Sequence, residues 1–323
     1  MLLTTIRKEL RSRDSRFTAV EGTIAGGYFD ADYETLNEAD AHIVEGDRLE
    51  AFDVGPAESS EFTAFLDSIQ RAEIKFCHDA VPIIYAYGAA VIRERLNRQM
   101  RTLRRDGAEM LLERHALFFP SEHVPRQSMP DFTASGLGLV DITPEGSESL
   151  PLFPPLLYAR AKQFVNRWRE GLEKEVACRW CAAPAGWLLV DGSLTMAPEV
   201  AACRQAAGII KAHRTRFFDG DDARVLLNLK PGQRTSVFEP AIRHDAPVRS
   251  WYLRVRPAEH RDVFWGLVRI EVALSADVSL ADRISRWILA ETRPLSLPDA
   301  RWDRLMYAIH DCEEFLRSRA PRL

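Results

Sequence analysis

The first feature of this sequence that could take part in chemistry is an acid that directly follows an apolar run. Residues 187–190 are apolar and lead directly into Asp191, Gly192 and Ser193. The pattern predicts a buried strand that presents a carboxylate at a turn, where the glycine lets the backbone bend sharply. A carboxylate in that position can hold a metal ion, or it can bond locally as an ordinary turn former.

Cations follow a second apolar run a little later in the chain. Residues 206–210 are apolar, and Lys211 comes directly after them. The basic residues that follow are His213, Arg214 and Arg216. A carboxylate at one strand end and a cationic cluster at the next suit a site that handles a metal ion and phosphate. The same residues also fit an Asp-Gly turn and a basic surface loop.

Two other acids resemble Asp191 in their setting. Glu21 ends the apolar run 17–20 and precedes a glycine, and Glu173 lies just off the apolar stripe of a predicted helix. Three carboxylates brought together repel one another and so imply a compensating cation. Mg²⁺ or Mn²⁺ prefers carboxylate oxygens, and a pair of such ions drives phosphodiester hydrolysis. Taken singly, Glu21 also fits a solvated turn acid, and Glu173 also fits a helical partner of Arg169.

Several other kinds of site are disfavoured. The sequence contains no G-x-S-x-G elbow of a serine hydrolase and no P-loop for ATP. Cys178 and Cys181 form a lone C-x-x-C, and no second ligand pair at zinc spacing accompanies it. With five cysteines scattered along the chain, we expect a reduced structural pair rather than a disulfide framework.

The elements that must position these residues alternate between strand and helix. We expect an antiparallel meander over residues 17–54, a helix over 155–176 and strands at 187–190 and 206–210. Further strands are expected at 225–229, 251–255 and 264–272, and helices at 281–290 and 298–317. Alternation of this kind predicts an α/β fold, with residues 1–323 forming one elaborated domain.

Residues 59–150 are predicted as a helical insertion within this domain. Phe62, Phe65, Leu66 and Ile69 have the spacing of one buried helix face. Arginines crowd the region that follows: Arg93, Arg95, Arg98, Arg101, Arg104 and Arg105. Such a run is typical of a solvated helix face, and it also fits a surface that contacts DNA. Residues 115–150 are expected to form a long irregular connection.

Composition limits the partners and the location of the protein. The formal net charge is -4, so contacts with nucleic acid must come from local basic patches. No apolar run approaches the ~20 residues that span a bilayer, so no membrane association is expected. The first residues are too short and too charged for a signal peptide, which favours a cytoplasmic protein.

Four segments together resemble the NurA nucleases: residues 19–23, 169–173, 188–194 and 208–211. The D-G-S-L and G-x-x-K pair, in this order, is the most specific part of the resemblance. It implies an RNase H-like mixed sheet that opens antiparallel and carries helices on both sides. It also implies a metal-dependent DNA nuclease, with a pair of Mn²⁺ or Mg²⁺ ions, that works as a homodimer. The partner implied is a hexameric HerA-type ATPase that feeds DNA into it.

The resemblance also assigns roles to single residues. Asp191 matches the D-G-S metal ligand, and Glu173 matches the helical glutamate, although Glu170 and Glu175 lie close enough to compete. Glu21 falls where the family has an aspartate, and the extra methylene changes what its carboxylate can reach. Lys211 is implied to lie near the scissile phosphate.

The closing helix and the basic residues complete the implied site. His310 matches the family's late histidine, which binds phosphate or a metal-bound water. The tyrosine position holds Trp302 instead, with Tyr307 as a stand-in. The residues expected to hold the DNA backbone are Arg98, Arg101, Arg105, Lys211, Arg214 and Arg216.

Another class of function is also compatible with these residues. The departure at Glu21 and the missing tyrosine are consistent with a catalytically weakened, RNase H-like scaffold that binds DNA or the ATPase. A third reading, an Argonaute-like nucleic-acid binder, needs guide-binding modules for which the chain has little room. DNA repair and defence against phage are both compatible with the nuclease.

Overall fold

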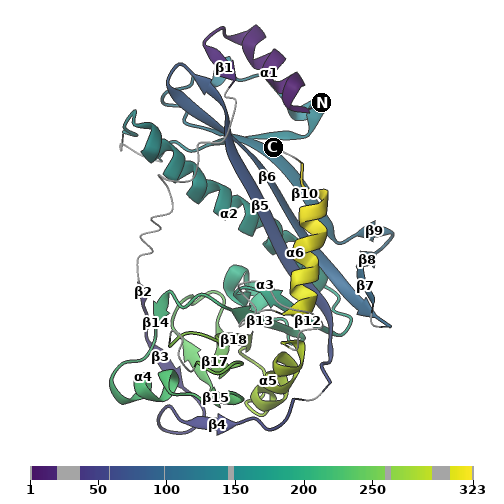
Figure 1. Ribbon diagram of the computed structural model, residues 1–323, viewed down its shortest axis with the longest axis vertical. Helices are drawn as coiled ribbons and strands as arrows, with labels where there is room; N and C mark the ends of the chain where they lie inside the picture. Colours follow the sequence, from purple (N-terminus) through teal and green to yellow (C-terminus); the bar gives the residue numbers. More distant parts are fainter. Residues whose placement is uncertain are drawn as a thin grey trace.

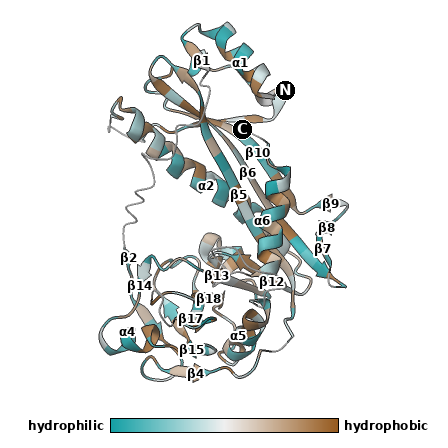
Figure 2. Ribbon diagram, in the orientation of Figure 1, coloured by the Kyte–Doolittle hydropathy of each residue, from teal (hydrophilic) through white to brown (hydrophobic). Residues whose placement is uncertain are grey.

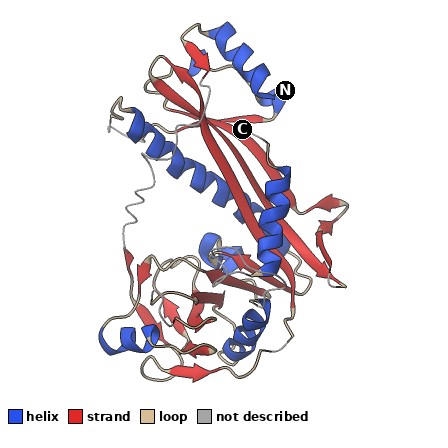
Figure 3. Ribbon diagram, viewed as in Figure 1, coloured by secondary structure: helices blue, strands red, loops and turns tan. Residues whose placement is uncertain are grey.

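The computed structural model describes residues 2–19, 37–57, 59–97, 99–144, 149–258, 263–292 and 306–321. These residues form an α/β structure in which one 14-stranded mixed sheet is flanked by helices (Figure 1, Figure 3). The expected mixed sheet with flanking helices is therefore confirmed. Among the helices described, none is long and apolar enough to cross a membrane.

Five neighbouring strands form the centre of the sheet. In spatial order they are β10 (Leu111–Phe119), β6 (Val81–Leu96), β5 (Phe62–His78), β12 (Trp187–Asp191) and β13 (Ala206–Ile210). Among the first three, β6 runs antiparallel to both of its neighbours, β10 and β5, and β12 and β13 run parallel to β5. Three antiparallel strands followed by two parallel ones are compatible with an RNase H-like sheet. The expected antiparallel opening is present, but it begins at β5.

Helices cover both faces of these central strands. They are α2 (Pro154–Cys181) and α6 (Tyr307–Arg319), in which hydrophilic and hydrophobic residues alternate along the ribbon (Figure 2). Even-numbered residues of β5, such as Ala64 and Leu66, pack in one core with α2. Odd-numbered residues, such as Phe65 and Ile69, pack in another core with α6. Because successive side chains of a strand point to opposite faces, both faces of β5 are apolar where a helix covers them.

The prediction of a helical insertion over residues 59–150 is wrong. No α-helix occurs among the described residues of this range, which belong mainly to β5, β6 and β10. The shorter elements are β7 (Gln99–Thr102), β8 (Arg104–Arg105), β9 (Ala108–Glu109), β11 (Leu137–Asp141), and the 3-10 turns η1 (Arg126–Ser128) and η2 (Thr133–Ser135). Apolar residues on both faces of a covered strand remove the alternation that marks a half-buried strand, and their spacing then mimics a helix.

Residues 20–36 of the predicted meander lie outside the described residues, and among the rest of residues 17–54 the prediction is wrong, although short strands occur there. They are β1 (Phe17–Ala19), β2 (Asn37–Glu38), β3 (Ala41–Ile43) and β4 (Ala51–Asp53). Each pairs with a distant strand: β1 with β5, β2 with β14 (Thr215–Arg216), β3 with β16 (Phe238–Pro240) and β4 with β15 (Gln233–Thr235). The N-terminal helix α1 (Leu2–Arg13) packs Ile6 and Leu10 onto the far end of β5 and β6.

Beyond β13 the sheet continues through the later part of the chain. The predicted strand pair is confirmed as β17 (Val248–Arg254) and β18 (Leu267–Ala273), which are antiparallel, and the predicted helix as α5 (Leu280–Glu291). The strand predicted at 225–229 is wrong, since α4 (Gly220–Leu227) ends there.

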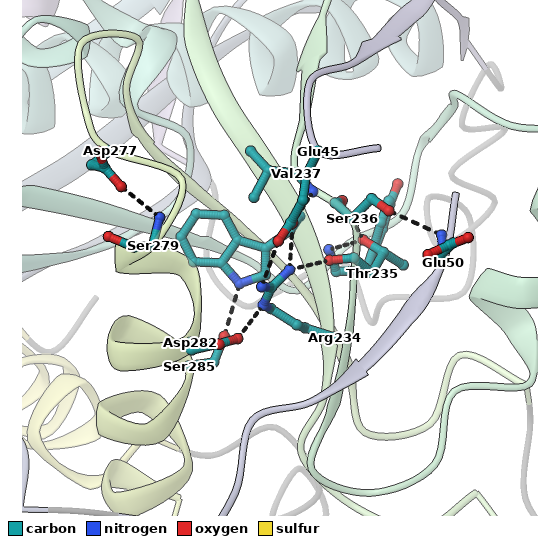
Figure 4. A network of polar contacts seen from close by, with 12 residues as sticks. Glu45, Glu50, Arg234, Thr235, Ser236, Val237, Asp277, Ser279, Asp282 and Ser285 are labelled. Atoms are coloured by element: carbon teal, nitrogen blue, oxygen red, sulfur yellow. Dashed lines mark hydrogen bonds and ion pairs between the residues drawn. The ribbon is translucent and has the colours of Figure 1, made fainter. Parts of the chain in front are cut away.

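One buried arginine ties this part of the molecule together (Figure 4). Arg234, on β15, is 3% exposed and forms ion pairs with Glu45 at 2.6 Å and with Asp282 at 2.6 Å. Glu45 also accepts a hydrogen bond from the backbone of Val237 at 2.9 Å. Because a buried guanidinium needs partners on all sides, this network holds the loop before β4, strand β15 and helix α5 in one arrangement.

Candidate active site

The turn after β12 is held in place by two glycines. Gly192 has a φ of 140° and its N–H donates to the carbonyl of Ile209, on β13, at 3.0 Å. A Cβ atom on Gly208 would lie 2.6 Å from the carbonyl oxygen of Gly192. Only glycine at 208 therefore lets the turn lie against β13, and the turn fixes the backbone from which Asp191 projects.

Lys211 reaches this carboxylate from the next strand. It follows the last residue of β13, and its Nζ donates to Oδ2 of Asp191 at 2.7 Å. Both side chains are about one quarter exposed, at 27% for the lysine and 25% for the acid. The D-G-S-L and G-x-x-K segments, noted separately in the sequence, therefore form one unit.

Glu173 enters the same region from α2. It is buried, and its Oε1 accepts hydrogen bonds from Ser68 Oγ at 2.5 Å and from Arg169 Nη1 at 2.6 Å. Burial raises the pKa of Glu173, and the nearby charge of Arg169 opposes that rise. Of the competing glutamates of α2, Glu170 is exposed and lies 3.7 Å from Arg169, and Glu175 pairs with Arg179 on the helix surface.

A third acid, Asp67, lies in the middle of β5 beside Asp191. The last paired residues of β5 and β12 are Leu66 and Val190, so the two aspartates are next in register on adjacent strands. Asp67 is buried, and burial followed by the charge of Asp191 raises its pKa well above the usual value, while Lys211 opposes the rise. The charge of Glu173, from α2, also raises the pKa of Asp67.

Asp67 was not among the acids selected from the sequence. Glu21 was selected for the first-strand role, and both Glu21 and Arg98 lie outside the described residues. The signal for Asp67 was available: it is an acid inside the apolar run of residues 62–69. Reading that run as a helix hid it, because a helix would not place Asp67 next to the end of β12.

The histidine of the closing helix is not joined to the acids. His310 Nδ1 lies 3.4 Å from Glu313 Oε2 on its own helix, and within the described residues its ring makes no hydrogen bond or ion pair with Asp67, Glu173 or Asp191. Tyr307 begins the same helix, and Trp302 lies outside the described residues. A role for His310 at the site therefore remains a prediction.

The arginines expected to bind DNA are placed in different surroundings. Arg105 donates to the carbonyls of Arg179, Trp180 and Ala183 at the C-terminal end of α2, at 2.6, 3.2 and 2.5 Å. Arg101 pairs with Glu94 at 2.9 Å on the β6–β7 hairpin. These residues lie on strands, not on the long basic helix that was predicted.

The two later arginines also differ from each other. Arg216 pairs with Glu38 at 2.8 Å, and both side chains are exposed. Arg214 lines the groove described next.

A polar groove of about 590 Å³ opens beside the acids. Ser68, which bonds to Glu173, lies at its wall, and α2 and α6 contribute to the lining. The cations that line it are Arg71, Arg169, Arg214 and Arg317. No aromatic side chain is among its lining residues, so the groove suits a phosphate backbone better than stacked bases.

The donor set of the site fits a hard divalent cation. Asp67, Glu173 and Asp191 offer carboxylate oxygens only, which Mg²⁺ and Mn²⁺ prefer. Among the described residues, no three Asp, Glu, His or Cys side chains are gathered closely enough to hold an ion between them. Instead, Arg169 and Lys211 neutralise two of the acids. The site thus has the ligands for a metal but internal cations in contact with them.

The cysteines give no second metal site. All five are free thiols, and Cys178 and Cys181 are half-buried at the end of α2. This agrees with the expected reduced pair.

Comparison with known proteins adds no assignment to this geometry. No family model matches the chain, and no curated protein matches it. Its function is therefore inferred from the acids, the lysine and the groove.

Proposed function

We propose that this protein is a metal-dependent DNA nuclease of the NurA type. The observation that carries the proposal is that Asp67 and Asp191 are next in register on adjacent strands, while Glu173 reaches from α2 to Ser68, the neighbour of Asp67. An apolar core has no structural need for three neighbouring carboxylates, because each charge is costly to bury and each raises the pKa of the next. Such clusters are characteristic of functional sites.

The three acids would hold the divalent ions, with Asp67 in the role first given to Glu21. Ions bound there would supply the positive charge that polarises a phosphodiester and makes water a better nucleophile. Lys211 and Arg169 contact the acids from opposite sides, at 2.7 and 2.6 Å. We expect both cations to turn toward phosphate oxygens when substrate is present, since ammonium and guanidinium groups bind phosphate well.

The groove beside the acids supports a nucleic-acid substrate. Four arginines and two glutamates, Glu170 and Glu313, line it, so cations outnumber anions there although the net charge of the chain is -4. Contacts of this kind hold the backbone without reading sequence. The further expectations belong to the NurA resemblance: a homodimer, a HerA-type ATPase that delivers DNA, a cytoplasmic location, and a role in end processing or phage defence.

The scaffold is the second candidate, and a specific observation favours it. Glu173 and Asp191 each have an internal cation as partner, and the described residues include no ready-made metal cluster. A chain in which these ion pairs persist would bind DNA or the ATPase without cutting.

Cleavage of end-labelled linear DNA distinguishes the two candidates. The protein is tested with Mn²⁺, Mg²⁺ or EDTA, with and without the cognate ATPase. Asp191→Ala is the test variant, and Asp245→Ala, an exposed acid paired with Arg243, is the matched control. Cleavage that needs both metal and Asp191 supports the nuclease. Retention of DNA binding without cleavage in any condition would leave the scaffold.

A further inference from the structure

A buried glutamate on β18 contacts the turn that follows Asp191. Glu271 is 0% exposed. Its Oε2 accepts a hydrogen bond from Ser193 Oγ at 2.7 Å and another from the backbone N–H of Leu194 at 2.9 Å. The carboxylate therefore caps the first backbone positions after the D-G pair, although it comes from a strand nearly eighty residues away in the sequence.

The charge of this glutamate has one buried partner. Arg269 Nη1 lies 2.8 Å from Glu271 Oε1, and its guanidinium also stacks over the Phe217 ring at 5.1 Å. Every residue of β18 is buried, and the other residues of this strand are apolar; Ser250, opposite Glu271 on β17, accepts a hydrogen bond from Arg269 Nη1 at 3.5 Å. A buried ion pair is often no more stabilising than apolar residues of the same volume, so stability alone gives little reason for it here.

The position of the Glu271–Arg269 pair beside the Asp191 turn gives a better reason for its presence. The turn is held on one side by the bond from Gly192 N–H to the carbonyl of Ile209 and on the other by Glu271. Ser193 Oγ in turn accepts from the backbone N–H of Thr195 at 3.1 Å, which starts the short turn η3 (Leu194–Met196). With both ends of the turn fixed, the direction of the Asp191 side chain is fixed as well.

We propose that Glu271 is a positioning residue that holds the Asp191 turn in the geometry needed for catalysis. The proposal rests on the nuclease function for its catalytic consequence, but the ordering of the turn can be measured without any cleavage. Glu271 touches neither the acids nor the groove. It acts through Ser193 and Leu194.

The first test is hydrogen exchange, followed by mass spectrometry on peptides that span residues 188–197. Glu271→Ala removes the oxygen that accepts both hydrogen bonds, and we expect exchange in this segment to become faster by about tenfold or more, as for local opening of a constrained turn. Glu271→Gln keeps one oxygen for Ser193 and Leu194 and should restore most of the protection. Unchanged exchange in the alanine variant overturns the proposal, whether or not the wild-type protein cuts DNA.

The second test separates positioning from stability. Glu291→Gln is the matched control, because Glu291 is also buried and paired with an arginine, Arg95, at 2.6 Å, but lies on α5. We expect the alanine variant at 271 to lose about tenfold or more in kcat with little change in KM for DNA, since misplacement of a reacting group lowers kcat. The glutamine variant should recover most of that loss.

Two outcomes separate failure of this proposal from failure of the proposed function. If the wild type does not cut DNA, the nuclease assignment fails and the exchange data alone decide the role of Glu271. If the wild type cuts and the Glu271→Ala and Glu291→Gln variants lose kcat equally, Glu271 is only structural and the positioning role is overturned.

Discussion

Asp67 is the residue of the site with the least favourable charge. Its folded pKa lies above the unfolded value of 3.8 because of burial first and Asp191 second. The folded protein therefore holds this proton to higher pH than the unfolded chain, and the contribution of Asp67 to stability falls as pH rises above about 4. The loss of stability that Asp67 causes at neutral pH is expected only if its negative charge serves a function.

The Asp67→Asn variant tests that cost. It keeps the shape of the side chain and removes the charge, so we expect an equal or higher Tm at pH 7 and a smaller fall in stability between pH 4 and 7. Metal-dependent cleavage should drop by about 100-fold or more, because several kcal/mol of charge stabilisation disappear. Thermal unfolding and cleavage are measured against Asp79→Asn, an exposed acid at the β5–β6 turn. If the Asp67→Asn variant cleaves DNA as fast as the wild type, Asp67 is not part of the catalytic site.

Gly208 offers a second test at the scale of one atom. A methyl group there would lie 2.6 Å from the Gly192 carbonyl, so Gly208→Ala must displace the turn. We expect a loss of about 1–3 kcal/mol in the free energy of unfolding, as for overpacked cores, together with loss of cleavage. Gly171→Ala is the control, because a Cβ there meets nothing within 4 Å. In a helix that change should be neutral or stabilising by about 0.5–1 kcal/mol. Equal effects of both changes would contradict the role given to Gly208.

At the scale of elements, Arg105 connects the β8–β9 hairpin to the end of α2. Its guanidinium donates to three carbonyls at and just beyond the C-terminal end of α2, where helix carbonyls lack the regular intrahelical partners. Arg105→Ala should therefore lower the free energy of unfolding by about 1–2 kcal/mol, in line with hydrogen bonds to a charged group, and leave DNA affinity nearly unchanged. Arg101→Ala, on the neighbouring hairpin, should change stability by much less. Denaturant unfolding and DNA binding by anisotropy measure the two quantities. Weaker DNA binding by the Arg105→Ala variant without loss of stability would show instead that Arg105 contacts DNA.

Short apolar runs that end at turn residues could be predicted from the sequence, whereas the long strands β5 and β6 could not. α2, α5 and the strands β12, β13, β17 and β18 were identified because their apolar pattern and turn residues agree. β5 and β6 were missed, since α2 and α6 cover opposite faces and leave no alternation to detect. The β-branched and aromatic residues of β6 were the remaining strand signal.

The failure to recognise β5 as a strand also explains which site residues could be predicted from the sequence. Asp191 and Lys211 could be paired from sequence because each follows a recognisable strand, and two neighbouring parallel strands end at one edge. Glu173 could be selected from helix spacing. Asp67 was recognisable as an acid within the apolar run 62–69, but its place beside Asp191 depends on the pairing of β5 with β12, which no local pattern encodes.

At the scale of the whole molecule, the cations gather along one groove although the net charge is negative. Each phosphate contact there should contribute about 0.9 to the slope of log affinity against log salt. Replacing Arg317, which lines the groove, by Ala should therefore reduce that slope by about 1. Arg224→Ala is the control: Arg224 is an exposed arginine in a similar helical ion pair, but it lies on α4, away from the groove. Affinity titrations at several salt concentrations give both slopes, and equal slopes would place the DNA elsewhere.

The pairing of β5 with β12 has a consequence for the order in which the protein is made. Leu66 cannot pair with β12 until Val190, more than a hundred residues later, has been synthesised, and at typical synthesis rates this delay is roughly 10 s. During that time β5 can pair with β6, but the edge that receives β12 stays open on the ribosome, where it is exposed to aggregation and to chaperones. Asp67 meets Asp191 only after that delay, and α6 covers the sheet later still. The acids proposed to bind metal therefore come together only after Asp191 has been synthesised.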